Sequence, residues 1–302
     1  MKNIPNFKKI SFVEKLENNI NRKVEVGLRI NGHIKKGLEG NPLITIITVV
    51  RNKSDVIEET IQSVLNQKYK NIEYIIIDGE SDDGTTEKIM KYKDQLDYFV
   101  CEGDLGLYDA MNKGLSLAKG DLIGIVNGDD ILLPEATSIL VKYYTKYKDA
   151  EFFFGSVKKH WGTISGFHPH KIKYSWFFYT SHSTGFFIKR NAAYRNGAYS
   201  LNYKYSSDFD YFYRLIIHNK AKGIATKKDE VFGIFRPGGL SHTLDKEIHF
   251  FEKIQIRIDN KQNKIFLFFL IILKFIINQK GKDRIKIHKF TNFNSIFTFL
   301  IN

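Results

Sequence analysis

Apolar runs of strand length alternate along the first half of the chain with segments whose apolar residues recur at helical spacing. The runs are rich in β-branched or aromatic residues and cover 43–52, 72–79, 96–102 and 121–127. The helical patterns cover 54–67, 85–92 and 108–120. We expect Ser54 to begin the first helix and Gly120 to end the third. Strands that are apolar on both faces and alternate with helices predict an α/β fold, with a mostly parallel sheet covered by helices on both faces.

Polar residues follow each of the four predicted strands, at 51–52, 78–79, 102–106 and 127–130. The carboxyl ends of parallel strands share one edge of a sheet, and ligands bind there. The sequence therefore predicts one crevice that is lined by these four strand ends.

Two adjacent carboxylates, Asp129 and Asp130, end the fourth predicted strand. Such a pair is unfavourable unless water solvates it or a cation neutralises it, and a solvated turn is the simpler alternative. Mg²⁺ and Mn²⁺ commonly use one or two carboxylates together with phosphate oxygens. Neither a P-loop nor a Gly-x-Gly-x-x-Gly motif is present, so strand-end side chains would have to hold any nucleotide. A signalling receiver-like domain needs an acid pair after the first strand, where this chain has Arg51-Asn52.

Composition narrows the class of protein further. The 302 residues are 43% hydrophobic, which is ample for a folded core and excludes a disordered chain. One cysteine, Cys101, excludes an intramolecular disulfide framework and fits a reducing compartment. The first forty residues lack the continuous apolar segment of a signal peptide.

The net charge of +13 is concentrated in the two ends of the chain. Residues 1–41 carry nine basic and four acidic side chains, and residues 243–302 carry eleven and five. A nearly neutral central region argues against a nucleic-acid partner, and basic ends favour an anionic membrane surface. The apolar segment 264–278 is shorter than the roughly 20 residues of a spanning helix and fits a helix in the membrane interface. The alternative is a helix that packs on the domain or on a partner chain.

Several motifs in consistent order resemble the family 2 glycosyltransferases. They are "PLITIITVVRN", "IEYIIIDGESDDGT", "EGDLGLYDAMNKGLSLAKGDLIGIVNGDD", "HSTGFFIKR", "SSDFDYFYRL" and "GGLS". The resemblance covers 42–242 and implies a GT-A fold, with a nucleotide-binding half at 42–133 and an acceptor half at 134–242. Residues 1–41 would then be a basic extension, and 243–302 a basic, amphipathic, helical region that associates with the membrane.

The resemblance is greatest to bacterial members that build O-antigen, capsule or exopolysaccharide. It implies an inverting, metal-dependent transfer from a nucleotide-sugar, often UDP-linked, to a polyprenyl diphosphate-linked saccharide. The protein would be cytoplasmic and peripheral on the inner face of the membrane. The alternative is an inactive nucleotide-sugar-binding subunit of an assembly complex. Sugar, acceptor and oligomeric state, including a possible homo-oligomer, are not encoded in any motif.

For the donor side, the resemblance assigns the divalent metal, Mn²⁺ or Mg²⁺, to Asp129 and Asp130, with Asp130 in direct contact. Asp78 matches an acid near the uracil and ribose, but Gly79 stands where the family has a second acid. The remaining positions are assigned to donor binding: Val50, Arg51, Asn52, Asp109, Asn112 and Lys113. Met111 replaces a family arginine before Asn112, so contacts to the diphosphate would shift to Asp109 or Lys113.

For the acceptor side, Asp208 occupies the place of the family's Glu-Asp motif and is the expected catalytic base. A structural alternative is a carboxylate that stabilises a helix N-terminus, and Asp210 competes for the base role from another helix face. His182, Ser241 and His242 are expected near the acceptor or the diphosphate. A hydrogen-bonded structural histidine is the alternative for His182.

Overall fold

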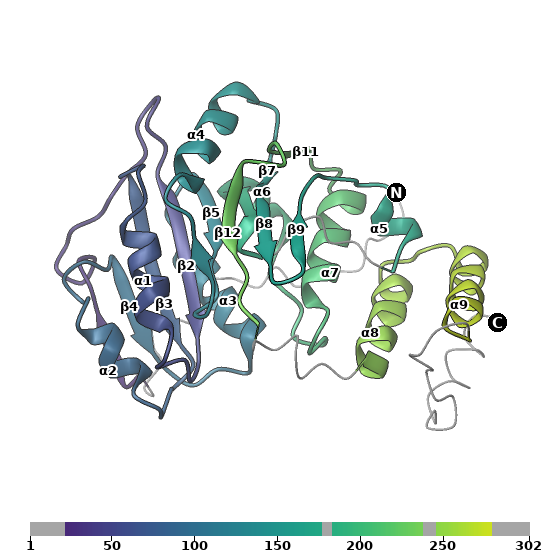
Figure 1. Cartoon of the computed structure of the whole chain (residues 1–302), viewed down its shortest axis with the longest axis horizontal. Helices are drawn as coiled ribbons and strands as arrows, with labels where there is room; N and C mark the ends of the chain where they lie inside the picture. The colour runs from purple at the N-terminus through teal and green to yellow at the C-terminus, as the bar shows by residue number, and fades with distance from the viewer. Residues whose placement is uncertain (1–21, 177–182, 238–245, 280–302) are drawn as a thin grey trace.

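The computed structural model describes residues 22–176, 183–237 and 246–279. Its centre is a large sheet whose strands run, in spatial order, β1 (Val24–Val26), β4 (Tyr98–Cys101), β3 (Ile72–Asp78), β2 (Ile44–Val50), β5 (Leu122–Ile125), β10 (Phe186–Lys189), β7 (Phe152–Phe154) and β11 (Gly223–Ala225) (Figure 1). The four strands β4, β3, β2 and β5 are mutually parallel. The predicted α/β architecture with a mostly parallel sheet is confirmed.

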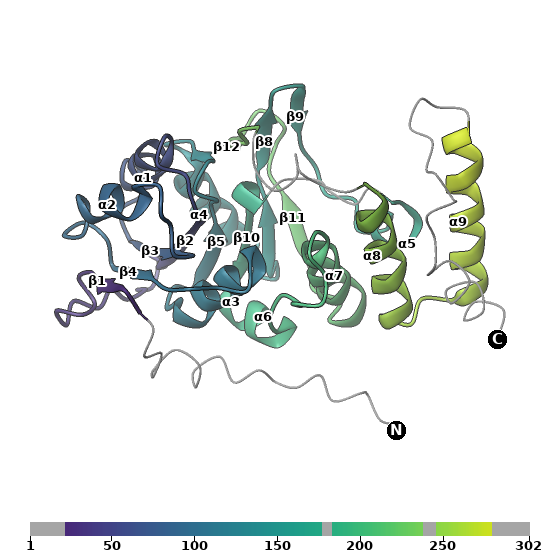
Figure 2. The same ribbon diagram turned by 90° about the horizontal axis from the view of Figure 1, so that it is seen from below.

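Helices cover both faces of this sheet (Figure 2). The helices of the described residues are α1 (Ile57–Leu65), α2 (Thr85–Met90), α3 (Leu107–Leu117), α4 (Ala136–Lys146), α5 (Lys171–Tyr174), α6 (Arg190–Asn196), α7 (Ser207–Tyr213), α8 (Lys246–Asp259) and α9 (Lys264–Gln279), of which α8 and α9 stand apart from the sheet, beyond α7. Short helical turns, η1 (Ser183–Gly185) and η2 (Arg214–His218), precede β10 and extend α7. Successive side chains of a strand point to opposite faces of the sheet, so the core has two parts. Ile47 of β2 packs with α3 on one face, and Ile46 packs with α1 on the other.

Beyond β5 the sheet becomes partly antiparallel. β10 pairs antiparallel with both β5 and β7, and β11 then pairs parallel with β7. A smaller sheet stands beside it, in the order β6 (Ile131–Leu132), β12 (Val231–Ile234), β8 (Ser156–Lys159) and β9 (Gly162–Ile164). Asp129 and Asp130 lie in the short connection from β5 to β6, so they stand where the two sheets meet.

Three local expectations differ from the structure. The helix predicted to begin at Ser54 begins at Ile57, because the Ser54 N–H donates to Asp83 in a loop contact. The third helix ends at Leu117 rather than at Gly120. Gly120 is required for another reason, since a Cβ there would lie 2.5 Å from the backbone nitrogen of Thr45. Residues 24–26, inside the predicted N-terminal extension, form β1 and pair antiparallel with β4.

The C-terminal helices stand beyond α7, and α9 is the outermost helix in Figures 1 and 2. α8 packs on α7, and the buried residues Phe250 and Ile254 of α8 contact Leu267 and Ile271 of α9. The outward face of α9 is also apolar, with Ile265, Phe269, Ile272 and Leu273 exposed. One face of α9 therefore packs on protein, as the alternative expectation had it, while the other remains open. No helix in the described ranges is long and apolar enough to span a membrane.

Candidate functional site

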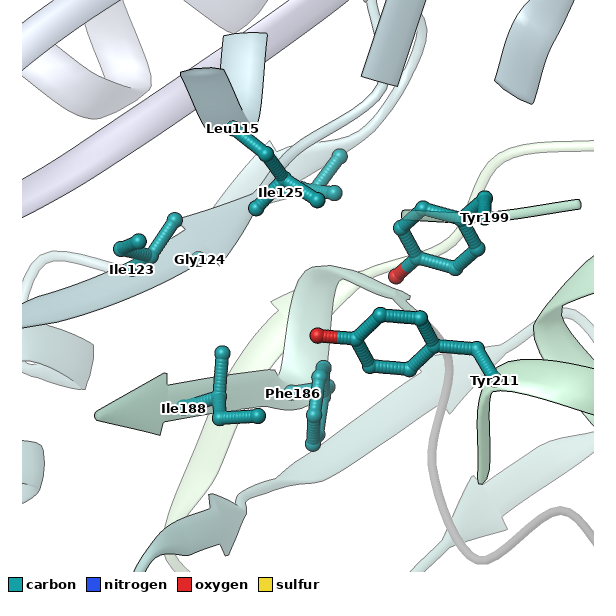
Figure 3. Close-up of a pocket in the computed structure, with 8 residues that line it drawn as sticks. All are labelled: Leu115, Ile123, Gly124, Ile125, Phe186, Ile188, Tyr199 and Tyr211. Atoms are coloured by element: carbon teal, nitrogen blue, oxygen red, sulfur yellow. The ribbon is translucent and has the colours of Figure 1, made fainter. Parts of the chain in front are cut away.

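One cavity in the described core is too small for a substrate. It measures about 10 Å³ and lies between β5, β10 and two stacked rings, Tyr199 and Tyr211, whose hydroxyls point toward it (Figure 3). Sites for small molecules usually measure hundreds of cubic ångströms, whereas this volume suits at most a water molecule. The candidate site is instead the polar carboxyl edge of the parallel strands, where ligands bind in folds of this kind.

The turn that carries the two aspartates is fixed from α1 and β2. The Thr60 hydroxyl of α1 lies 2.8 Å from the Asp130 carbonyl oxygen and 3.1 Å from that of Gly128, to which it donates. A Cβ on Gly128 would lie 2.6 Å from a methyl group of Val50, so only glycine fits there. Val50 itself is buried, and its carbonyl oxygen accepts the N–H of Gly79 over 2.9 Å. Any contact of Val50 with a donor is therefore limited by these internal contacts.

Asp130 is fully buried, and polar groups from two later segments face it. Its Oδ2 accepts the Thr184 hydroxyl over 2.7 Å, and its Oδ1 accepts the backbone N–H of Arg236 over 3.3 Å. Burial lowers the pKa of the Lys159 ammonium, while attraction to Asp130 opposes that lowering. Asp129 lies 2.9 Å, Oδ2 to Nζ, from Lys53. The pair is thus compensated by cations and hydrogen bonds and is not a solvated turn.

The donor set at this turn fits a divalent cation of the Mg²⁺ or Mn²⁺ type. Within the described ranges, no three His, Cys, Asp or Glu side chains form a group that could hold a metal by themselves. Asp129 and Asp130 supply two carboxylates in a partly closed setting, and Lys53 already places a positive charge against Asp129. Mg²⁺ and Mn²⁺ sites with phosphate ligands typically need no more protein ligands than these two.

The ends of β2 and β3 are joined by a reciprocal side-chain pair. The Asn52 amide donates to Asp82 over 2.8 Å, and the Asp82 N–H donates back to Asn52 Oδ1 over 3.0 Å. Asn52 has a φ of 52°, a left-handed conformation that asparagine tolerates better than most residues. Arg51, beside it, is exposed at the same edge. The two hydrogen bonds between Asn52 and Asp82 therefore hold the loop after β2 against the loop after β3.

The Asp78 carboxylate is buried and already used within its own loop. It accepts the N–H and hydroxyl of Ser81, over 3.2 and 2.6 Å, and the hydroxyl of Thr86. A different acid lies where the side chain of residue 79 would begin: a Cβ on Gly79 would be 2.2 Å from Asp104 Oδ2. The loop after β4 therefore supplies, through Asp104, a carboxylate at the position that the sequence lacks.

The three predicted donor residues on α3 have different surroundings. The Lys113 ammonium lies 2.8 Å from the buried Glu102 and donates to the Gly103 carbonyl over 2.7 Å. Asp109 accepts the Leu105 N–H over 3.1 Å, at the start of the helix. Asn112 is bonded at both ends of its amide to the backbone of Tyr199, over 2.9 and 2.8 Å. Asn112 thus links α3 to the second half of the chain, and its amide is engaged there and not at the donor site.

The segment with Asp208 reaches the same edge. Tyr108, at the start of α3, donates its hydroxyl to the Tyr205 carbonyl over 3.3 Å, and α7 begins two residues later. Asp208 lies in the first turn of α7, partly exposed, and accepts the Phe209 N–H over 2.7 Å. Asp210 is buried between Arg214, at 2.9 Å, and the Asn260 amide, at 2.9 Å. Of the two acids, Asp208 is the one open to a substrate; His182, Ser241 and His242 lie outside the described residues.

Comparison with known sequences identifies the family. The sequence model of Glycosyl transferase family 2 matches residues 45–208, more than half of the chain. The chain belongs to this family. A glycosyltransferase of Methanocaldococcus jannaschii is 23% identical over 258 residues, 78% of this chain and 89% of that protein. A glycosyltransferase of Mycobacterium tuberculosis is 37% identical over 90 residues, 30% of this chain and only about a third (34%) of the relative's length.

Solved structures agree with the expected GT-A fold. S. aureus TarS 1–349 in complex with UDP-GlcNAc has a TM-score of 0.62 at 14% identity, with 86% of this chain and 80% of that chain covered. Mannosyltransferase PcManGT from Pyrobaculum calidifontis, in complex with GDP-Man and Mn²⁺, has a TM-score of 0.50 at 15% identity, with 80% and 77% covered. The chain therefore has the GT-A architecture expected of its family.

Sequence reasoning missed three side chains at this edge, those of Lys53, Asp104 and Thr184, and the backbone N–H of Arg236. Asp104 and Thr184 lie in segments that the sequence singled out, "EGDLG" and "HSTGFF", but other residues of those segments were chosen. Lys53 directly follows the Arg51-Asn52 motif, and this position was the signal in the sequence that could have placed it at the site. Nothing in the sequence indicated that the backbone at Arg236 would reach Asp130.

Proposed function

We propose that the protein is an inverting, metal-dependent glycosyltransferase that moves a sugar from a UDP-sugar to a lipid-linked saccharide acceptor in bacterial surface-polysaccharide synthesis. The observation that carries the proposal is the compensated carboxylate pair Asp129–Asp130 at the end of β5, with the start of α7 at the same edge. The UDP-GlcNAc bound to TarS and the GDP-Man and Mn²⁺ bound to PcManGT support a nucleotide-sugar donor and a divalent metal.

In this proposal the donor lies across the ends of β2 to β5. Asp129 and Asp130 would hold Mn²⁺ or Mg²⁺, and the bound cation would supply positive charge for the diphosphate. Lys53, together with Asp109 and Lys113 of α3, lines the diphosphate side. Arg51, Asn52 and Asp104 line the nucleobase side, where the Asp104 carboxylate can accept the ring N–H of uracil.

Asp208 is the general base of the proposed reaction. Its carboxylate takes the proton from an acceptor hydroxyl while that oxygen attacks the anomeric carbon. The bond from the anomeric carbon to the diphosphate breaks in the same displacement, and UDP leaves. A single in-line displacement inverts the configuration of the sugar.

Calorimetric titration of UDP is the first test. We expect the wild-type protein to bind UDP with Mn²⁺ present, and EDTA to weaken binding about tenfold or more, equal to about 1.4 kcal/mol. Equal binding in EDTA would remove Asp129 and Asp130 from the donor site. If GDP bound more tightly than UDP in the presence of Mn²⁺, the donor would be a GDP-sugar and not a UDP-sugar.

The outward face of α9 supports the proposed contact with an anionic bilayer. Ile265, Phe269 and Leu273 recur at every fourth residue and are 70%, 62% and 53% exposed. Basic residues at 264 and 274 flank this stripe, and the sequence that follows it is strongly basic. An apolar stripe with adjacent cations suits the headgroup region of anionic lipids.

Polar substitution of this stripe tests the membrane proposal. The double variant Phe269→Ser/Leu273→Ser should bind phosphatidylglycerol vesicles at least about tenfold more weakly, since each buried apolar side chain contributes about 2 kcal/mol. Ile248→Ser, which changes an exposed apolar residue of α8, is the matched control in a vesicle sedimentation assay. Unchanged sedimentation of the double variant would show that α9 is not the membrane contact. Point variants are preferable to deletion of 260–302, because Asn260 and Gln262 contact the core.

A further inference from the structure

Helix α8, which lies outside the segment that matches the family, holds the chain that leads into Asp208. The Glu252 carboxylate accepts two successive backbone N–H groups, of Lys204 over 2.6 Å and of Tyr205 over 2.9 Å. α8 and α7 lie side by side in Figures 1 and 2 and contact one another. The position of the proposed base along the edge of the sheet is thus set in part by α8.

Lys253, the next residue of α8, brings a charge to the first turn of α7. Its ammonium group lies 5.7 Å from the centre of the Phe209 ring and donates to the Trp176 carbonyl over 3.0 Å. Phe209 directly follows Asp208, so the amine lies against the helical turn that carries the proposed base. A carbonyl and an aromatic face stabilise an ammonium group without cancelling its charge.

The charges around this amine single out Asp208. Burial lowers the pKa of Lys253 to about 8, attraction to Asp208 raises it, and Arg257 of α8 and Lys274 of α9 lower it. Lys253 in turn helps burial to lower the pKa of His249, one helical turn earlier, to about 4. Of these influences on the pKa of Lys253, attraction to Asp208 is the one that raises it.

We propose that Lys253 is a positioning residue of the glycosyl transfer, whose ammonium group, packed against the first turn of α7, favours the ionised form of the Asp208 carboxylate. This inference rests on the proposed function, in which Asp208 is the base. A carboxylate acts as a base only in its ionised form, and a nearby cation favours that form. Because α8 carries this cation, the C-terminal region takes part in the reaction as well as in membrane contact.

The test measures the pH dependence of kcat with UDP-GlcNAc, Mn²⁺ and a polyprenyl diphosphate-linked saccharide. Lys253→Met should move the acid limb of the profile to higher pH by about one unit, which lowers kcat about tenfold on that limb. Lys253→Gln, whose amide can still donate to Trp176, should show the same shift, and Lys253→Arg should restore the wild-type profile. Metal-dependent UDP binding should stay unchanged in all three variants. In an Asp208→Asn background, Lys253→Met should cause no further loss.

Three other outcomes would each overturn the inference, and each points to a different explanation. A normal acid limb in both neutral variants would show that the charge of Lys253 does not act on the base. A raised KM for the acceptor with an unchanged profile would make Lys253 a ligand of the acceptor phosphates instead. Failure of wild-type protein to bind UDP or to release it from UDP-sugars would overturn the proposed function, and this inference with it.

Discussion

Replacement of Asp130 by asparagine is expected to abolish the metal-dependent part of UDP binding. Asparagine keeps the shape of the side chain and can still accept the Thr184 hydroxyl, so the turn between β5 and β6 should survive. The substitution removes the negative charge that a divalent cation requires. We expect the affinity for UDP in Mn²⁺ to fall to that of the wild-type protein in EDTA, a loss of about tenfold or more, equal to about 1.4 kcal/mol, in calorimetric titrations.

Asp149→Asn is the matched control for this experiment, because Asp149 is an exposed acid just before β7, at the edge of the sheet opposite the site. It should bind UDP as the wild-type protein does, with and without Mn²⁺. If Asp130→Asn retained full metal dependence, Asp129 would become the metal ligand. Asp129→Asn would then be the variant that loses the effect.

Replacement of Asp208 by asparagine is expected to stop transfer while donor binding stays intact. The amide cannot accept the proton of the acceptor hydroxyl, and general bases of this kind contribute about 10²- to 10⁴-fold to a rate. Asp208 lies at the start of α7, away from the β5–β6 turn, so metal-dependent UDP binding should not change. Release of UDP in the presence of acceptor, followed alongside the binding titration, separates the two effects.

Asp210→Asn, two residues away, is expected to lower stability and to leave transfer nearly unchanged. Its carboxylate is buried with Arg214 and Asn260, and loss of one partner of a buried ion pair typically costs about 3–5 kcal/mol. We expect a lower free energy of unfolding in urea but a near-normal kcat for the folded fraction. A fall in kcat for Asp210→Asn, with normal transfer by Asp208→Asn, would exchange the roles of the two acids.

The parallel part of the fold could be predicted because its signals are local. β2, β3, β4 and β5 are apolar on both faces, and the polar residues that follow them share one edge as a matter of topology. Asp129 and Asp130 were placed correctly at the end of β5. The ion pair of Asp129 with Lys53 and the hydrogen bond from Thr184 to Asp130 followed from no pattern; the 183–185 turn reaches Asp130 only through the pairing of β10 with β5.

Pairings between segments distant in sequence account for most of what sequence reasoning missed. β1 joins the sheet through β4, more than seventy residues later, although its alternating Val-Glu-Val run is too short to predict a strand. Asn112 matches a family motif, yet its amide is used by the Tyr199 backbone. The acid missing at position 79 is supplied by Asp104, a residue of another loop. In each case the contact depends on the three-dimensional path of the chain and not on residue type.

The antiparallel pairing of β10 with β5 has a consequence for motion. Phe187 and Ile188 of the second half lie in register with Gly124 and Ile123 of the first, so both halves share one continuous ladder of backbone hydrogen bonds. A hinge between the halves would have to break that ladder, which two-domain enzymes with separate sheets need not do. Opening and closing around substrates must therefore come from the loops at the carboxyl edge. The distance between the donor side and the acceptor side of the site would then stay the same throughout the reaction cycle.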